Sequence, residues 1–276
     1  MSKVLIDESN LQAIADSIRA KNGTQETYLP SEMSTAIDNI SGGGGVPDWS
    51  QIGYEDVPES IIEGFNYAKN IYDNWDSSIT SMSNKYNGNV NIVFFPNVDT
   101  KNVKQFSNTF NNCSSLLYVD TLNASNATSM YNIFGGCKSL LNVKKIITSS
   151  KLKQFNNAFS QNVNLRSVPL FDTSKVYNIG LAFSGCTSLK NIPIFDFSNI
   201  GSWEGQSFYE GAYTGCTSLT EESLHNIIIS FSRNTKISNI KTLRILGLTS
   251  AQSEICTTFT EWQTMSQNGW TTGYEE

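Results

Sequence analysis

A pattern of about 24 residues recurs five times in the middle of this chain, and it constrains the fold more than any other feature. One copy is AFSGCTSLKNIPIFD, residues 182–196, in which an aromatic residue, a cysteine and a leucine follow one another at intervals of three. The leucine column has steps of 24, 25, 24 and 30 residues, and the other two columns keep the same register. The columns are Leu116, Leu140, Leu165, Leu189 and Leu219; Phe110, Phe134, Phe159, Phe183 and Tyr213; and Cys113, Cys137, Asn162, Cys186 and Cys216.

Each copy also has an internal pattern. Val103, Phe106 and Phe110 stand at i, i+3 and i+7, which predicts a short helix or helical turn, and the segments after each leucine are short and strand-like, as in LLYVDTL and LLNVKKI. A leucine, a Cys or Asn and a short strand in every period of 20 to 29 residues are typical of leucine-rich repeats. We therefore predict an α/β solenoid, a leucine-rich repeat of about five 24–25-residue tiles with capping segments, plus an N-terminal helical hairpin.

A polar column precedes each predicted helical turn. Its side chains can accept hydrogen bonds from the unpaired first N–H groups of a turn, and we interpret the column as caps. A stacked acidic column could instead bind calcium, although Asn and Thr occupy two of its five positions. The column consists of Asp99, Asn123, Thr148, Asp172 and Asp196.

The cysteine column could likewise have a packing role or a chemical role. Stacked thiols could form disulfides or hold metal ions, but the chain has no C-x-x-C pair and a single histidine to serve as a second ligand type. Asn162 is a substitution that a small buried position tolerates. An odd count of five cysteines also argues against a complete disulfide framework. We expect these cysteines to be inert packing residues.

Composition and motifs argue against several classes of function. The formal net charge is -6 with only 16% charged residues, which favours neither a nucleic-acid groove nor binding to an anionic membrane. No window is apolar enough to span a bilayer, and the first residues lack the apolar core of a signal peptide. The motifs of phosphate loops, zinc proteases and serine hydrolases are absent. His225 is expected to be structural, and we predict no enzyme activity, cofactor or metal.

Changes in pattern along the chain divide it into five segments. The central repeats are flanked by capping segments, because the first and last copies of a repeat need covering to stay soluble. Within the N-terminal cap, the spacing from Ile61 to Trp75 predicts a helix. The C-terminal cap is predicted as helix, strand, helix and final strand, with Cys256 buried. The segments are 1–41, a helical hairpin for attachment or oligomerisation; 42–46, a glycine hinge; 47–90, the N-terminal cap; 91–219, the leucine-rich repeats; and 220–276, the C-terminal α/β cap.

Two groups of residues are candidates for binding. The apolar positions of the N-terminal hairpin predict attachment to another structure: Leu11, Ile14, Ile18, Met33 and Ile37. The last repeat contains the insert GSWEGQSFYEGAY, and insertions in repeat proteins often form loops on the binding face. Its aromatic residues Trp203, Phe208 and Tyr209 are therefore predicted to bind a partner, or alternatively to pack against the C-terminal cap.

The repeats resemble a known family. FDTSKVYNIGLAFSGCTSLKNIPIF is similar to the BspA-like leucine-rich repeats of bacterial surface proteins and phage proteins. LQAIADSIRAKNGT with LPSEMSTAIDNI resembles a short module near the start of structural proteins of phages that infect Gram-positive bacteria. GLTSAQSEICTTFTEWQTMSQNGWTT is similar to the closing segment of such phage repeat proteins, with Gln and Asn where Lys and Gly would be usual.

These resemblances imply a function that periodicity does not supply. They imply a non-enzymatic structural protein of a phage virion, in a tail, baseplate or fibre, which attaches through its N-terminus and presents its repeats. The expected partners are other virion proteins and a host cell-surface glycan or protein, with no nucleic acid and no membrane insertion. A homo-oligomer located in the virion and assembled in the host cytoplasm is expected. The alternative is a bacterial cell-surface adhesion protein of the BspA-like class.

Overall fold

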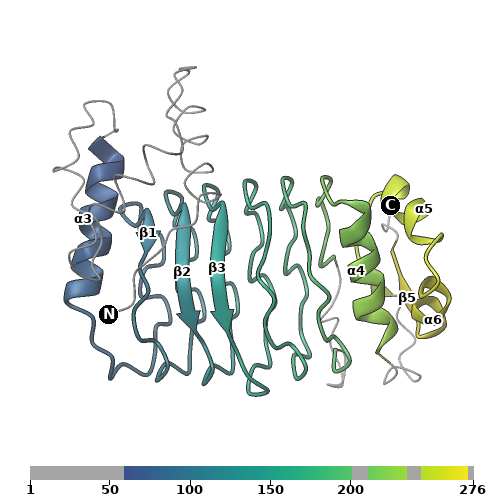
Figure 1. Ribbon diagram of the computed structural model, residues 1–276, viewed down its shortest axis with the longest axis horizontal. Helices are drawn as coiled ribbons and strands as arrows, with labels where there is room; N and C mark the ends of the chain where they lie inside the picture. Colours follow the sequence, from purple (N-terminus) through teal and green to yellow (C-terminus); the bar gives the residue numbers. More distant parts are fainter. Residues whose placement is uncertain (1–58, 201–210, 235–243, 273–276) are drawn as a thin grey trace.

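The computed structural model describes residues 59–200, 211–234 and 244–272. In these ranges the repeated segments lie side by side along the long axis of the molecule, with helices at both ends (Figure 1). The helices are α3 (Glu59–Asp73), α4 (Glu221–Ser232), α5 (Ser250–Cys256) and α6 (Trp262–Gln267). None of the described helices has the length and apolar character needed to cross a membrane.

The strands form two parallel sheets. The first is a three-stranded sheet in the order β1–β2–β3, with Tyr118 aligned with Phe94 on one side and with Asn142 on the other. The second pairs β4 with β5. The strands are β1 (Phe94–Phe95), β2 (Tyr118–Asn123), β3 (Asn142–Ile147), β4 (Arg244–Ile245) and β5 (Trp270–Thr271).

The predicted fold class, an α/β solenoid of leucine-rich repeats, is wrong. The described residues have a small open sheet of three parallel strands, and their four helices all lie before or after the repeated segments. The segment from Val103 to Phe110, which was expected to be a helical turn, contains no helix. The predicted N-terminal hairpin, 1–41, lies outside the described residues.

Backbone hydrogen bonding explains why the predicted helical turns are not helical. An α-helix needs each N–H group to bond to the carbonyl four residues earlier. Here alternate N–H groups bond to the next copy instead: Phe110 N lies 2.8 Å from the Ile133 carbonyl oxygen. The N–H groups between them bond three residues back, as Thr109 N does to Phe106 O at 3.1 Å. The apolar spacing of three and four residues thus arises from successive tight turns.

We call these hydrogen-bonded turns the turn wall. They contain two columns of residues with positive φ, a backbone conformation in which Gly and Asn are the least strained residues. The first column is Asn84, Asn108, Asn132, Asn157 and Leu181, and the second is Gly88, Asn112, Gly136, Gln161 and Gly185. The wall comprises residues 80–89, 104–113, 128–137, 153–162 and 177–186, and 211–216 continue it.

We call the sheet β1–β3 and the two segments that follow it, 166–171 and 190–195, the strand wall. The predicted strands in LLYVDTL and LLNVKKI are confirmed as β2 and β3. The later two predicted strands are not strands, and a single bridge, Ser167 to Asn191, connects them. Each contains a proline, Pro169 or Pro193, which has no N–H group to donate to a sheet.

The core lies between the two walls. The strand wall contributes Val119 and Leu122, both fully buried, and the turn wall contributes a row of aromatic rings. Successive rings in that row stack with centroids 5.2 to 5.8 Å apart, which confirms the aromatic column as one continuous feature. The row is Tyr86, Phe110, Phe134, Phe159, Phe183 and Tyr213.

The helix predicted between Ile61 and Trp75 is confirmed as α3, which ends at Asp73. It lies against the first copy through buried Ala68 and Ile71. The approach at Gly64 is so close that a Cβ atom there would lie 2.2 Å from a Val93 methyl group. Glycine therefore allows the helix to cover this end of the core.

Helix α4 covers the other end, and it does so with polar side chains. Ser223 Oγ donates to the Lys190 carbonyl (2.7 Å) and accepts from Ile192 N (2.9 Å), and Ser230 Oγ accepts from Phe195 N (2.9 Å). These bonds satisfy backbone groups that an uncovered edge would leave unpaired. Beyond α4, the predicted helix and final strand are confirmed as α5 and β5, with α6 between them and Cys256 buried at the end of α5.

Candidate binding surface

The residues that the sequence predicts for binding cannot be located in this structure. Trp203, Phe208 and Tyr209 fall in 201–210, and the attachment residues Leu11, Ile14, Ile18, Met33 and Ile37 fall in 1–58, both outside the described residues. Gly211, near the end of the insert, lies so close to the turn wall that a Cβ atom there would be 3.1 Å from Leu181 Cδ2. The candidate surface is therefore built from the described walls.

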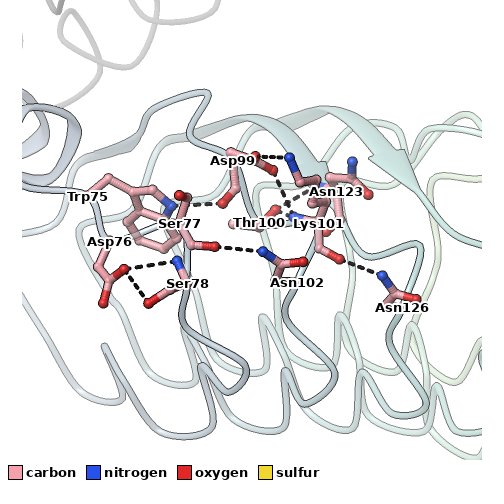
Figure 2. Close-up of polar contacts among 10 residues, drawn as sticks. All are labelled: Trp75, Asp76, Ser77, Ser78, Asp99, Thr100, Lys101, Asn102, Asn123 and Asn126. Carbon is pink, nitrogen blue, oxygen red and sulfur yellow. Dashed lines mark hydrogen bonds and ion pairs between the residues drawn. The ribbon is translucent and has the colours of Figure 1, made fainter.

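The edge where each copy passes from the strand wall to the turn wall is held by short polar contacts (Figure 2). Asp99 Oδ1 accepts from Lys101 N (3.1 Å), and Asn102 Nδ2 reaches back to the Ser77 carbonyl (2.9 Å). Asn126, one copy later, repeats that contact by donating to the Lys101 carbonyl (2.7 Å). Side chains of this edge thus tie each copy to the one before it.

This geometry corrects the interpretation of the polar column as helix caps. No helix follows these residues, and Asp99, Asn123, Asp172 and Asp196 each accept from the N–H group two residues later, which is an Asx turn. Hydrogen bonds from the Lys101 side chain and backbone hold the pKa of Asp99 below its usual value. Within the described ranges, no three His, Cys, Asp or Glu side chains lie together as a metal site would require.

The cysteines of the central column confirm the packing interpretation. All are buried, and each thiol lies 2.9 or 3.0 Å from the carbonyl of the aromatic residue in the preceding copy, as Cys137 does with Phe110. Burial raises the pKa of Cys113 to about 11 and that of Cys186 to about 12. A thiol must ionise to act as a nucleophile, so these groups are unreactive at neutral pH.

Asn162 occupies the cysteine position of one copy and is less well accommodated. It is fully buried, and among the described residues neither its Oδ1 nor its Nδ2 atom has a hydrogen-bond partner. A buried polar group without a partner costs about 1–3 kcal/mol. The substitution is tolerated by size, as expected, but it weakens this copy.

His225 has a structural environment, as the sequence predicts. Its Nε2 atom lies 2.9 Å from Glu261 Oε2, and its ring stacks on Phe259 with centroids 4.5 Å apart. The hydrogen bond from His225 lowers the pKa of Glu261. The contact joins α4 to the residues at the start of α6.

The outer face of the turn wall repeats in register over five copies of the described structure. Side chains of neighbouring copies bond to one another across it: Gln105 Nε2 donates to Thr128 Oγ1 (3.2 Å), and Gln154 Nε2 donates to the Tyr177 hydroxyl (3.2 Å). Asn132 Nδ2 likewise donates to Asn108 Oδ1 (2.9 Å). The backbone bridges beneath run from Ser81 through Gln105, Ser129 and Gln154 to Asn178.

This surface was not predicted from the sequence, because the recurring columns of aromatic, Cys and Leu residues are buried. The signal for the turns is the recurrence of Asn or Gly at two positions four residues apart, with Gln161 and Leu181 as exceptions. Leu181 has φ 55° and is 44% exposed. The outer face then has a flat array of amides and hydroxyls with Tyr131, 38% exposed, among them.

One comparison with known proteins gives a match. Residues 59–167 match the family model described as "Mycoplasma protein of unknown function, DUF285", a family linked to BspA-like surface repeat proteins. The match covers α3, β1–β3 and the first part of the turn wall. No curated protein and no solved structure matches the chain.

Proposed function

We propose that this protein is a non-enzymatic structural protein that presents its turn wall as a binding surface. The observation that carries the proposal is the outer face of that wall, where amide and hydroxyl side chains of five consecutive copies are in register. In this column Ser81, Gln105 and Gln154 are at least partly exposed, whereas Ser129 and Asn178 are buried. The stacked rings beneath it and the hydrogen bonds between copies make the surface rigid. A partner that binds such a surface does not have to order it first, which reduces the cost of binding.

The setting that we propose is a phage virion. Its support is the resemblance of segments at both ends of the chain to phage structural proteins, and the N-terminal segment would attach the body to the particle. The other partner would be a host surface or another virion protein.

Purified particles test the setting directly. Mass spectrometry of particles released from an induced culture of the source strain should find the chain in a fixed ratio to the major tail protein. A full-length variant with Leu11→Asp and Ile18→Asp should be lost from particles, whereas Glu8→Gln, a matched change in the same segment, should be retained. Particles without the chain would overturn the virion setting.

A second candidate is a bacterial cell-surface adhesion protein of the BspA-like class. The family match over residues 59–167 favours it, because that family is linked to surface repeat proteins. In this case the chain should appear in the envelope fraction of cells that release no particles. In both settings the turn wall is the binding surface. The settings differ only in whether a phage particle or a bacterial cell surface displays the protein.

A further inference from the structure

The distribution of charge in this chain is strongly uneven. Residues 91–200 contain ten Lys or Arg and four Asp, a net charge of +6, although the whole chain carries -6. The remaining residues therefore carry -12. No carboxylate occurs between Asp120 and Asp172, a stretch that contains six basic residues. The middle of the molecule is basic and both ends of the sequence are acidic.

The turn wall shares this asymmetry. None of its five segments contains Asp or Glu, and Lys85, Lys104 and Lys153 belong to it. Lys104 and Lys153 are exposed and occupy the same column, in copies separated by the one that contains Thr128. Because adjacent parallel segments lie about 4.8 Å apart, the two lysines stand about 10 Å apart along the wall.

The groups between and beside the lysines are suited to a polymer rich in hydroxyl groups. Thr128 lies between Lys104 and Lys153 on the hydrogen-bonded segments, and Tyr131 exposes its ring three residues along the same copy. Amide side chains offer both donors and acceptors. The amides of Gln105 and Gln154 can therefore bond to sugar hydroxyls as well as to Thr128 and Tyr177, their partners in the next copy. An exposed aromatic ring can pack against the C–H face of a sugar.

We infer that the outer face of the turn wall binds an extended anionic polysaccharide, which lies along the stack and crosses successive copies. Lys104 and Lys153 contact its acidic groups, the Gln105 and Gln154 amides contact its hydroxyl groups, and the Tyr131 ring packs on a sugar. A nucleic acid fits less well, because single strands are held by successive stacking rings and the face offers amides at most positions. The inference rests on the proposed function and names its ligand class.

Binding of polygalacturonate to the full-length protein tests this inference. Isothermal titration should show binding at low salt that weakens as salt is added, and the methyl-esterified polymer, which has the same backbone without charge, should bind much more weakly. The variant K104Q/K153Q should bind polygalacturonate about tenfold more weakly. The matched variant K145Q/K190Q removes the same charge from the strand wall and should bind like the wild type.

Three results would overturn the inference: equal binding of the methyl ester, equal loss in both double variants, or tighter binding of an oligothymidylate than of polygalacturonate. Tyr131→Ala, a surface change, should weaken polygalacturonate binding and leave oligothymidylate binding unchanged. If polygalacturonate fails to bind while the protein still adsorbs to whole cells, the ligand class is wrong and the binding function stands. Failure of both would overturn the proposed function as well.

Discussion

The turn wall and the strand wall enclose one core, but they are built in opposite ways. In the strand wall, the backbone is extended and successive side chains point to opposite faces. Strand pairing stops at the segments in which Pro169 and Pro193 have no N–H group to donate. In the turn wall, N–H groups that bond within the turn alternate with N–H groups that bond to a neighbouring copy, and this pattern recurs in each segment from 80–89 to 177–186. The wall without regular secondary structure is thus the more continuously bonded one.

This difference shows that hydrogen bonding between copies depends more on the direction in which backbone N–H groups point than on the strand propensity of the residues. Asn and Gly are poor strand and helix residues, yet at positive φ they allow every turn to present donors to its neighbour. The stacked rings then lie directly behind these bonds. We expect changes in the turn wall to affect the whole molecule more than matched changes in the strand wall.

The largest expected effect comes from removing a ring of the turn wall. Phe134→Ala should lower the free energy of unfolding by about 4 kcal/mol, because the ring is fully buried between Phe110 and Phe159. Phe171→Ala, a size-matched change in the strand wall, should cost about 3 kcal/mol because Phe171 is less completely buried, with 6% of its surface exposed. Urea unfolding measures both. Equal costs would show that the walls do not differ in this respect, and the reverse order would contradict the greater importance of the turn wall.

The next effect is alkaline sensitivity, to which the turn wall contributes four of the five buried thiols and the strand wall none; the fifth, Cys256, lies in α5. Its buried thiols have raised pKa values, about 11 for Cys113 and about 12 for Cys186, against 9.0 for an ordinary thiol. Because the folded protein favours the neutral thiol, the contribution of these thiols to the free energy of unfolding is fully present below pH 9. It is lost as the pH rises through the folded-state pKa values of about 11 and 12. The loss approaches about 1.4 kcal/mol per pH unit for each thiol.

The control for this prediction is the double variant C113A/C186A. It should be less stable at neutral pH because each alanine leaves a small cavity, yet its free energy of unfolding should fall less steeply between pH 9 and 11. Chemical denaturation at a series of pH values provides the slopes. Identical slopes in the two proteins would mean that other groups cause the alkaline loss.

A smaller effect should follow from repairing the irregular copy of the turn wall. Asn162→Cys replaces two unpartnered polar atoms with a thiol that can donate to the Phe134 carbonyl, as the other column members do one copy apart. We expect a gain of about 1–2 kcal/mol in the free energy of unfolding. The reverse change, Cys137→Asn, should lose a similar amount, and a stabilised C137N variant would contradict this account.

The smallest effect should come from mending the strand wall. Pro169→Val with Pro193→Val restores two N–H donors, but the stiffness of proline in the unfolded chain is lost, so the net change should stay within about 1 kcal/mol. Amide hydrogen exchange is the sensitive measurement, and protection should rise across 166–171 and 190–195. Unchanged protection would show that something other than proline interrupts the sheet.

Several parts of the fold could be predicted from the sequence because each depends on a local pattern. The apolar spacing of α3 and the strand-like runs of β2 and β3 identified these elements. The helical turns could not be predicted correctly, because the spacing of Val103, Phe106 and Phe110 is the same in a helix and in two successive tight turns. Only the neighbouring copies decide between them, by accepting the N–H groups that a helix would use internally.

The candidate surface was harder to predict for a related reason. The buried cysteines and rings recur almost without variation, whereas exposed positions such as Thr128 and Lys153 differ from copy to copy. Their common column becomes visible once the backbone bonds align the copies. The binding role of Trp203, Phe208 and Tyr209 stays a prediction, since these residues lie outside the described ranges.

The polar inner side of α4 has a consequence for how molecules of this kind can change in size. Ser223 and Asn226 of α4 occupy donors and acceptors of the last copy, and Asn234, two residues beyond the helix, donates through Nδ2 to both Phe197 O and Ile200 O. Helix α4 therefore leaves these backbone groups of the last copy closed to the edge of another molecule. Duplication of a 24-residue unit in the interior would leave the helices at both ends of the stack in place. Length can therefore vary by whole units during evolution while both ends stay covered.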